Sequence, residues 1–230
     1  MCKLVEGFEG EYTRPVDHKK MAFIDRHLAP RRPCSVFELG CGHGLILQNL
    51  RDCDVVGIEI DKGEAEIARA SGIDVRVGHA GRYDAGRKFD VVIASEVIEH
   101  MREPQSLLDN AARHRHPGGM LLLTTPNGYG YYELSERHLN PLYLIRTNNV
   151  LRRLLGKNPY ERGDSFDHCQ WFTMGRLLRM AKRAGFSLME RENSDFITGS
   201  EFDIQLAAKL PYWLVSGWYF AFRNMPEIIG

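Results

Sequence analysis

The chain has 230 residues, of which 43% are hydrophobic and 26% charged, which is enough for one well-packed domain. Its 30 lysines and arginines balance 30 aspartates and glutamates, so no overall basic field draws it to nucleic acid. Five cysteines without a C-x-x-C pair argue against a disulfide framework or a zinc site and favour reduced thiols in a cytosol.

Targeting signals are not evident in the sequence. The N-terminal residues lack the apolar core of a signal peptide. The longest apolar stretch, 206–222, is interrupted by Lys209 and Pro211 and is too short to span a bilayer. We therefore expect a cytoplasmic protein with no transmembrane segment.

The first predicted element is a helix over residues 16–28, with apolar residues on one face and Pro30 just beyond its end. We interpret it as a cover for the edge of a sheet. The alternative is a lid over a bound ligand, which Tyr12 or His18 could reach.

Strands and helices then alternate along the chain. Each strand is a nearly continuous apolar run, as in parallel sheets that are covered on both faces. The predicted strands cover 36–39, 55–60, 74–77, 89–94, 120–124 and 186–190, and the predicted helices cover 45–50, 62–70, 104–115 and 173–185. This pattern predicts one α/β domain with three layers and a doubly wound, mostly parallel sheet.

The alternation breaks at two places. A turn at 116–119 leads into the fifth strand. After that strand, residues 126–170 form an aromatic and polar insert, with a helix expected around 139–155. Residues 200–230 are apolar and aromatic, but we identify no strand there.

A glycine-rich turn follows the first strand, in the stretch Glu38-Leu39-Gly40-Cys41-Gly42-His43-Gly44. Glycines at alternate positions let the backbone approach a ligand closely, because no Cβ intervenes. The second strand ends in Glu59, about 20 residues on, a spacing that suits ribose hydroxyls. Glu59 could also be a solvated strand end. Nicotinamide sites use G-x-G-x-x-G, whereas here the third glycine comes one residue early, which argues against that cofactor.

The pattern E-x-G-x-G-x-G resembles motif I of the class I S-adenosylmethionine (SAM)-dependent methyltransferases. The stretch 95–101 (SEVIEHM) resembles the E-x-x-E-H segment of ubiquinone-type O-methyltransferases, and Thr-Pro-Asn at 125–127 and D-H-x-x-W-F-T at 167–173 fit the wider type 11/23 family. The resemblance covers about residues 34–190. It implies a Rossmann-like fold, SAM as cofactor and S-adenosylhomocysteine (SAH) as product. The family usually inserts an antiparallel seventh strand beside the fifth. That strand is hard to find here: either the chain is truncated after Gly230, or residues 200–230 supply a degenerate version of it.

The resemblance also implies a cofactor site. The turn and Glu38 would hold the methionyl part and Glu59 the ribose, while Ser95 and Glu96 would lie beside the sulfonium. His79-Ala80 occupies the adenine position, where relatives often have an acidic residue, so this contact departs from the common pattern. The full predicted cofactor set is Glu38, Gly40, Cys41, Gly42, Gly44, Glu59, Ile60, His79, Ala80, Ser95 and Glu96.

Methyl transfer to a hydroxyl requires a base, for which we predict His100 or His168. Histidine suits this role because it titrates near neutral pH. Each has a structural alternative: His100 could fix its loop, and His168 could cap or pack ahead of a helix. Glu99 could orient His100 or cap the following turn.

Together, Glu96, Glu99, His100 and His168 resemble the metal ligands of the small-RNA 2′-O-methyltransferases. The same letters recur in relatives that are not metal enzymes. A divalent metal is therefore possible but not favoured, and we assign no metal ligand.

The sequence thus indicates a SAM-dependent methyltransferase acting on a hydroxyl of a small molecule or glycoconjugate. The alternatives are a metal-assisted RNA 2′-O-methyltransferase and a non-catalytic SAM-binding partner protein, which resembles the methionine-biosynthesis proteins of this fold. We expect this chain to form one domain with four parts: a cover or lid (1–33), a SAM-binding core (34–125), a substrate-recognition insert (126–170) and a C-terminal part (171–230).

The insert and the tail should determine the acceptor. Tyrosines of the insert offer flat surfaces for a ring or sugar. Its basic residues, within 146–157, are better explained as a solvated helix face than as an anion site. Trp213 and Trp218 are expected to pack on the sheet, with peripheral membrane contact as the alternative, and nucleic acid is not the expected partner.

Overall fold

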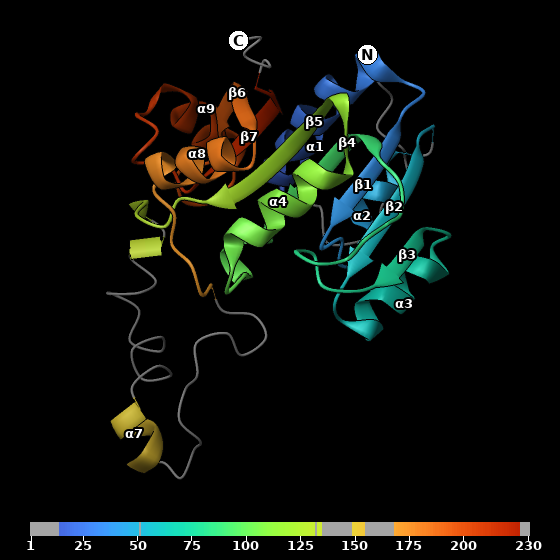
Figure 1. Ribbon diagram of the computed structural model, residues 1–230. Helices are drawn as coiled ribbons and strands as arrows, with labels where there is room; N and C mark the ends of the chain where they lie inside the picture. Colours follow the sequence, from blue (N-terminus) through green and yellow to red (C-terminus); the bar gives the residue numbers. More distant parts are fainter. Residues whose placement is uncertain (1–13, 51, 132, 135–148, 155–167, 226–230) are drawn as a thin grey trace.

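The computed structural model describes residues 14–50, 52–131, 133–134, 149–154 and 168–225 (Figure 1). A seven-stranded sheet in the order β3-β2-β1-β4-β5-β7-β6 forms the centre. The strands are β1 (Ser35–Leu39), β2 (Asp54–Glu59), β3 (Asp74–Val77), β4 (Phe89–Ser95), β5 (Arg115–Pro126), β6 (Phe186–Asn193) and β7 (Gly217–Asn224). The helices are α1 (Pro15–Leu28), α2 (Leu45–Gln48), α3 (Lys62–Ala70), α4 (Pro104–His114), α7 (Asn149–Leu154), α8 (Met174–Arg183) and α9 (Glu201–Lys209), with short 3-10 turns at Ala29–Arg31 and Ile98–His100.

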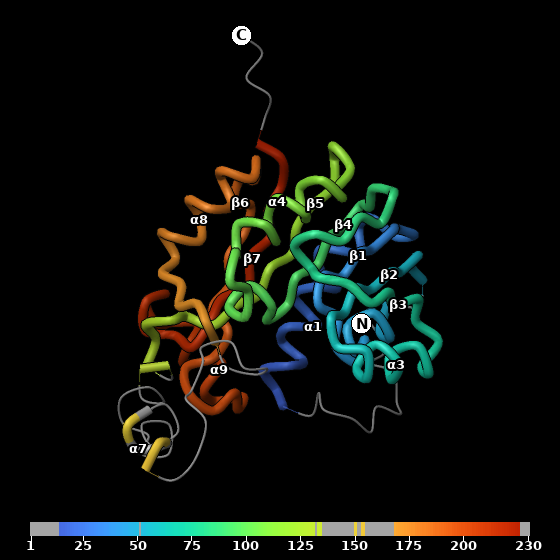
Figure 2. The backbone as a smooth tube through the Cα atoms, turned by 60° about the horizontal axis from the view of Figure 1, so that its bottom comes forward, coloured from blue at the N-terminus to red at the C-terminus, as the bar shows by residue number. Residues whose placement is uncertain are grey.

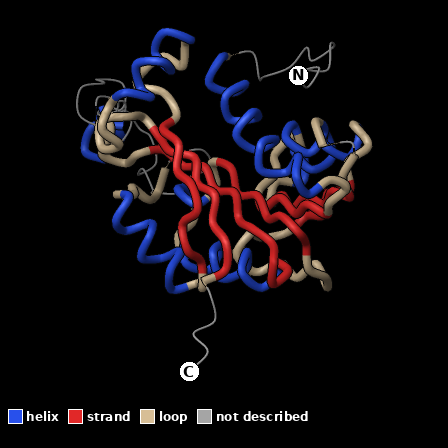
Figure 3. The backbone as a smooth tube through the Cα atoms, turned by 90° about the horizontal axis from the view of Figure 1, so that it is seen from above, coloured by secondary structure: helices blue, strands red, loops and turns tan. Residues whose placement is uncertain are grey.

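The predicted three-layer architecture is confirmed. Strands β1 to β5 pair in parallel, in the order that Figure 2 shows from one edge of the sheet to the other. Helices cover both faces of the sheet (Figure 3). Alternate residues of each strand point to opposite faces, so that Val92 packs in the core under α4 and α8, whereas Val91 packs in the core under α1, α2 and α3.

The sequence showed no clean strand after residue 200, but the structure contains one. Strand β7 lies antiparallel between β5 and β6 and completes the sheet in the way that the resemblance implied. Its first six residues, beginning with Gly217, are buried, so the strand lacks the alternation that marks a half-exposed strand. Trp218 packs in the core, as predicted, whereas Trp213 is 56% exposed.

Smaller differences concern where elements begin and end. The predicted turn at 116–119 forms a register shift within β5, where Arg115 pairs with Phe89 and Met120 with Val91. The helix after the glycine turn has only four residues, not six. His114, at the end of α4, is buried, and its Nε2 accepts a hydrogen bond from the backbone N–H of Ala85.

Parts of the insert fall outside the described residues. Of the helix predicted over 139–155, only α7 is described. Tyr129 and Tyr131 are about half exposed, at 53% and 50%, and the other tyrosines of the insert lie outside the described range. Across the described parts of the chain, no helix combines the length and hydropathy that a membrane span requires.

Candidate functional site

A large open cavity lies at the carboxyl ends of β1, β2 and β4, where open parallel sheets bind their ligands. Its volume is about 1280 Å³, which exceeds the roughly 300–1,000 Å³ of most small-molecule pockets and leaves room for a cofactor and an acceptor together. The predicted cofactor residues that line it are Glu38, Gly40, Cys41, Gly42, Glu59, Ile60, His79, Ala80, Ser95 and Glu96. Gly44 is the one member of the predicted set outside this lining.

The glycines of the turn all have left-handed backbone conformations, with φ of 75° at Gly40, 51° at Gly42 and 74° at Gly44. They differ in surroundings. A Cβ on Gly40 would lie 2.6 Å from a methyl of Val97, and one on Gly44 would lie 3.1 Å from the Cβ of Ala68. A Cβ on Gly42 would meet no atom within 4 Å, because this position faces the cavity. Gly42 is therefore the glycine that lets a ligand approach, whereas Gly44 allows packing on α3.

Glu59 is held by the backbone around it. Its Oε2 accepts a hydrogen bond from the N–H of Gly42 at 2.9 Å. Its Oε1 accepts from the N–H groups of Ile60 at 2.7 Å and Asp61 at 3.0 Å. Each carboxylate oxygen can accept more than one hydrogen bond, so Glu59 keeps capacity for a diol while its orientation is fixed.

Glu38 is buried at the base of the cavity, with 2% of its surface exposed. Its Oε2 has no hydrogen-bond partner among the described residues. Burial raises the pKa of Glu38 well above its usual range, which the positive charge of Lys20 opposes and the carboxylate of Glu59 reinforces. A buried carboxyl oxygen without a partner is costly, so a cationic or hydrogen-bond-donating ligand would stabilise it.

Lys20 is a cavity residue that our sequence reasoning missed. It lies on α1, is only 9% exposed, and places its Nζ 3.8 Å from Oε1 of Glu96. Asp17 of the same helix and Arg14, at its N-cap, also line the cavity. Of the two residues named for the lid alternative, His18 is exposed and outside the lining, and Tyr12 lies outside the described residues.

The side of the cavity formed by His79, Ala80 and Ile60 has a different character. Nδ1 of His79 accepts a hydrogen bond from the backbone N–H of Gly81 at 3.1 Å, which places the ring proton on Nε2. Ala80 is buried, whereas Ile60 is 66% exposed at the rim. A polar ring, a small residue and an apolar side chain together suit a flat heteroaromatic ring.

The end of β4 carries Ser95 and Glu96. Glu96 has a left-handed backbone with φ of 53°, which is uncommon outside glycine and asparagine and is typical of functional sites. Its Oε1 accepts a hydrogen bond from the hydroxyl of Thr124 at 2.6 Å, and the hydroxyl of Ser95 lies 3.0 Å from the same threonine oxygen. The strained turn thus places Glu96 in the lining of the cavity.

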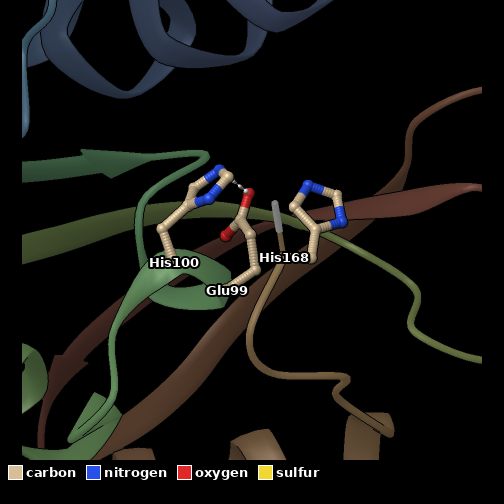
Figure 4. A group of neighbouring side chains, drawn as sticks. All are labelled: Glu99, His100 and His168. Atoms are coloured by element: carbon tan, nitrogen blue, oxygen red, sulfur yellow. Dashed lines mark ion pairs between the residues drawn. The ribbon is translucent and has the colours of Figure 1, made fainter. Parts of the chain in front are cut away.

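Glu99, His100 and His168 come together although 68 positions separate the two histidines in the chain. Figure 4 shows the carboxylate of Glu99 between the two imidazoles. The ring centroids of His100 and His168 are 5.0 Å apart, and Oε1 of Glu99 is 4.0 Å from Nε2 of His100. His100 also lines the cavity.

Glu99 is fully buried, and its Oε2 accepts a hydrogen bond from the hydroxyl of Thr125 at 3.1 Å. Burial raises the pKa of Glu99 well above its usual range, and the negative charge of Glu96 raises it further. Both effects favour the neutral form of Glu99, whereas His100 beside it lines the cavity.

The same three side chains each place one potential ligand atom within 4.8 Å of the others. A carboxylate with two imidazoles fits a transition metal such as Zn²⁺ better than Mg²⁺, which prefers oxygen ligands. Glu96, the fourth residue of the resemblance to metal enzymes, is not part of this group.

The chain is similar in sequence to known proteins. A family model described as a methyltransferase domain matches residues 12–191. Over 125 residues the chain is 32% identical to a ubiquinone biosynthesis O-methyltransferase from Azorhizobium caulinodans, a match that covers 50% of this chain and 49% of the relative. The chain thus spans about half the length of the relatives of this kind that it matches.

Solved structures with a similar fold are more distant in sequence. The N-methyltransferase NodS from Bradyrhizobium japonicum, in complex with SAH, is 13% identical with a TM-score of 0.58, and the match covers 93% of this chain and 90% of NodS. A SAM-dependent methyltransferase from Clostridium acetobutylicum is 12% identical with a TM-score of 0.63, over 95% and 94% of the two chains. At these identities the likeness shows the fold.

Proposed function

Because the chain belongs to the methyltransferase domain family, we propose that it is a SAM-dependent methyltransferase that methylates a hydroxyl of a small molecule or glycoconjugate. The observation that carries the proposal is a pair of unlike carboxylates in one cavity. Glu59 is anchored by three backbone N–H groups, whereas Glu38 is buried with an oxygen that lacks a hydrogen-bond partner in the described structure. A ligand with a ribose diol and an ammonium group matches this pair.

SAM fits the cavity residue by residue. Glu59 accepts the ribose hydroxyls, and Glu38 receives the ammonium group of the methionyl part. Lys20, a buried cation near both Glu38 and Glu96, is suited to the carboxylate of the same methionyl part. The pocket beside His79 takes the adenine. Glu96 brings its carboxylate toward the sulfonium.

SAM supplies an activated methyl group on its sulfonium. The protein must align the acceptor oxygen behind that methyl and remove the hydroxyl proton. His100 lines the cavity and His168 is its neighbour, which supports both as candidates to receive the proton. The exposed aromatic rings of Tyr129 and Tyr131, at the start of the insert, offer flat surfaces for an acceptor.

Two experiments test the proposal. Calorimetric titration of the purified protein with SAH should give micromolar binding at one site. Transfer of a radiolabelled methyl group from SAM should then be screened over phenols, nucleotide sugars, glycolipids and amines. Absence of SAH binding would overturn the cofactor assignment, whereas SAH binding with transfer only to amines would overturn the choice of oxygen as acceptor. SAH binding with no transfer, together with a co-purifying protein, would favour the non-catalytic alternative.

The cluster of Glu99, His100 and His168 favours one further possibility, metal-assisted transfer to a ribose hydroxyl of RNA. A chelator distinguishes it from the metal-free reaction. Transfer to a short RNA that is abolished by the chelator and restored by Zn²⁺ or Mn²⁺ would support the RNA reaction. Transfer to a small molecule that is unaffected by the chelator would exclude it.

A further inference from the structure

Glu133 meets His168 across the two ends of the insert. Oε1 of Glu133 lies 2.9 Å from Nδ1 of His168. The side chain of Glu133 is 8% exposed and that of His168 is 32% exposed. A carboxylate this deeply buried requires hydrogen-bond donors, and the imidazole N–H supplies one.

This contact dictates the chemistry of the ring. An ionised carboxylate can only accept hydrogen bonds, so Nδ1 of His168 must carry the proton. In the neutral imidazole Nε2 then has no proton and can accept one. Figure 4 shows the ring of His168 with one nitrogen toward the side of Glu99 and His100 and the other turned away from it. With Nδ1 committed to Glu133, the nitrogen toward His100 is Nε2.

His100 lacks the equivalent support from Glu99. The distance of 4.0 Å between Nε2 of His100 and the carboxyl oxygen is too long for a hydrogen bond. Glu133 thus holds His168 at hydrogen-bonding distance, whereas Glu99 does not hold His100 in this way.

We propose that Glu133 is a positioning residue that holds His168 in the tautomer with its proton on Nδ1, so that Nε2 receives the proton of the acceptor hydroxyl. This inference rests on the proposed function and specifies its base. In the step, the O–H bond of the acceptor and the S–CH₃ bond of SAM break and the O–CH₃ bond forms. The proton passes to Nε2 of His168, and SAM becomes SAH.

Nitrogen NMR of the resting protein tests the tautomer without any acceptor. Protein labelled with ¹⁵N-histidine is measured at about pH 8.5, two units above the ordinary imidazole pKa, with the His168 signals assigned by their loss in His168→Gln. Wild type should show an unprotonated Nε2. Glu133→Gln should show mixed tautomers, because an amide can donate or accept. Glu133→Ala should lose the preference, and Glu66→Gln, at an exposed site on α3, should match wild type.

Two results would overturn the proposal: a proton on Nε2 in the wild type, or an unchanged tautomer in a Glu133 variant. SAH affinity and far-ultraviolet circular dichroism establish that each variant is folded. If Glu133→Ala does not fold, Glu133→Gln, which keeps the shape of the side chain, decides the question. These readouts do not depend on turnover, so the tautomer can be supported even if no acceptor is methylated.

Kinetics provides the second measurement once an acceptor is known. Glu133→Ala should lower kcat about ten- to a hundredfold, less than the roughly 10²–10⁴-fold that a general base itself contributes, while KM for SAM stays unchanged. Glu133→Gln should recover part of that loss. A rise in KM for the acceptor with kcat unchanged would instead indicate that the contact only holds the insert closed, and would overturn the proposal.

Discussion

The carboxylate of Glu59, at the end of β2, accepts a hydrogen bond from the backbone N–H of Gly42 in the turn after β1. The contact joins the two elements that we assign to the cofactor, so that a single side chain both shapes the glycine turn and offers oxygens to the ligand. Its replacement should therefore affect the binding of the ligand.

Glu59→Ala should weaken SAH binding by about ten- to a hundredfold, because a hydrogen bond to a charged group contributes roughly 1.5–3 kcal/mol. Calorimetric titration measures the affinity, and Glu66→Ala, an exposed glutamate on α3, serves as the matched control. An affinity within twofold of wild type would contradict the assignment of the ribose to Glu59.

Lys20→Met should weaken SAH binding but not the binding of 5′-methylthioadenosine, which lacks the amino acid part. The reason is that Lys20 lies near Glu38 and Glu96, away from the residues assigned to adenine. Competition binding with both ligands measures the difference, with Lys62→Met on α3 as control. An equal loss of affinity for the two ligands would contradict the assignment of Lys20 to the amino acid part of the cofactor.

The ligand-free Glu38→Gln variant should be more heat-stable than the wild type, by a margin that grows as the pH rises. Burial raises the pKa of Glu38, so above the unfolded-state value of about 4.3 the folded protein keeps a proton that the unfolded chain releases. The free energy of unfolding of the wild type therefore falls with rising pH until the raised pKa is passed. Glutamine does not titrate, so the variant lacks this pH-dependent loss of stability.

The measurement is the melting temperature of Glu38→Gln and wild type from about pH 4 to about pH 8. The difference should be small at the acid end and grow toward neutrality, by about 2–4 °C for each kcal/mol. At neutral pH the same variant should bind SAH more weakly. A difference that stays constant with pH would argue against a raised pKa at Glu38.

Gly40→Ala should destabilise the protein more than Gly42→Ala. Both positions are left-handed, which costs an alanine about 1–2 kcal/mol. At Gly40 the new methyl also collides with Val97, whereas at Gly42 it enters the cavity. Urea denaturation should rank the two variants in this order, and SAH titration should show that Gly42→Ala loses affinity while it remains folded. Equal free energies of unfolding would contradict the packing difference.

The core of the fold could be predicted because its signals are local. The apolar runs of β1, β2 and β4 and the glycine turn between β1 and α2 lie within short segments. Strand β7 could not be recognised, because it follows an apolar stretch after α9 and is buried on both faces. Such a strand has no alternating pattern to mark it. Its place is fixed by partners on β5 and β6 that are far away in the sequence.

The cavity was predictable to a similar degree. Residues next to the strand ends, such as Glu59 and Glu96, could be found because strand ends are visible in the sequence. Lys20 could not, because helical periodicity assigns a lysine to the solvent face, and only the tertiary structure buries it beside other charges. Glu133 had no motif of its own, and its contact with His168 depends on the path of the insert.

The chain leaves the sheet and returns to it at neighbouring points. The backbone N–H of Gly128 donates to the carbonyl of Phe172 at 3.1 Å, and the contact between Glu133 and His168 lies just beyond. When the ends of a loop are fixed, doubling its length costs only about 0.6 kcal/mol in closure entropy. Relatives could therefore exchange this whole segment as a cassette and acquire new acceptors by recombination, while the strands that hold the cofactor stay under separate selection.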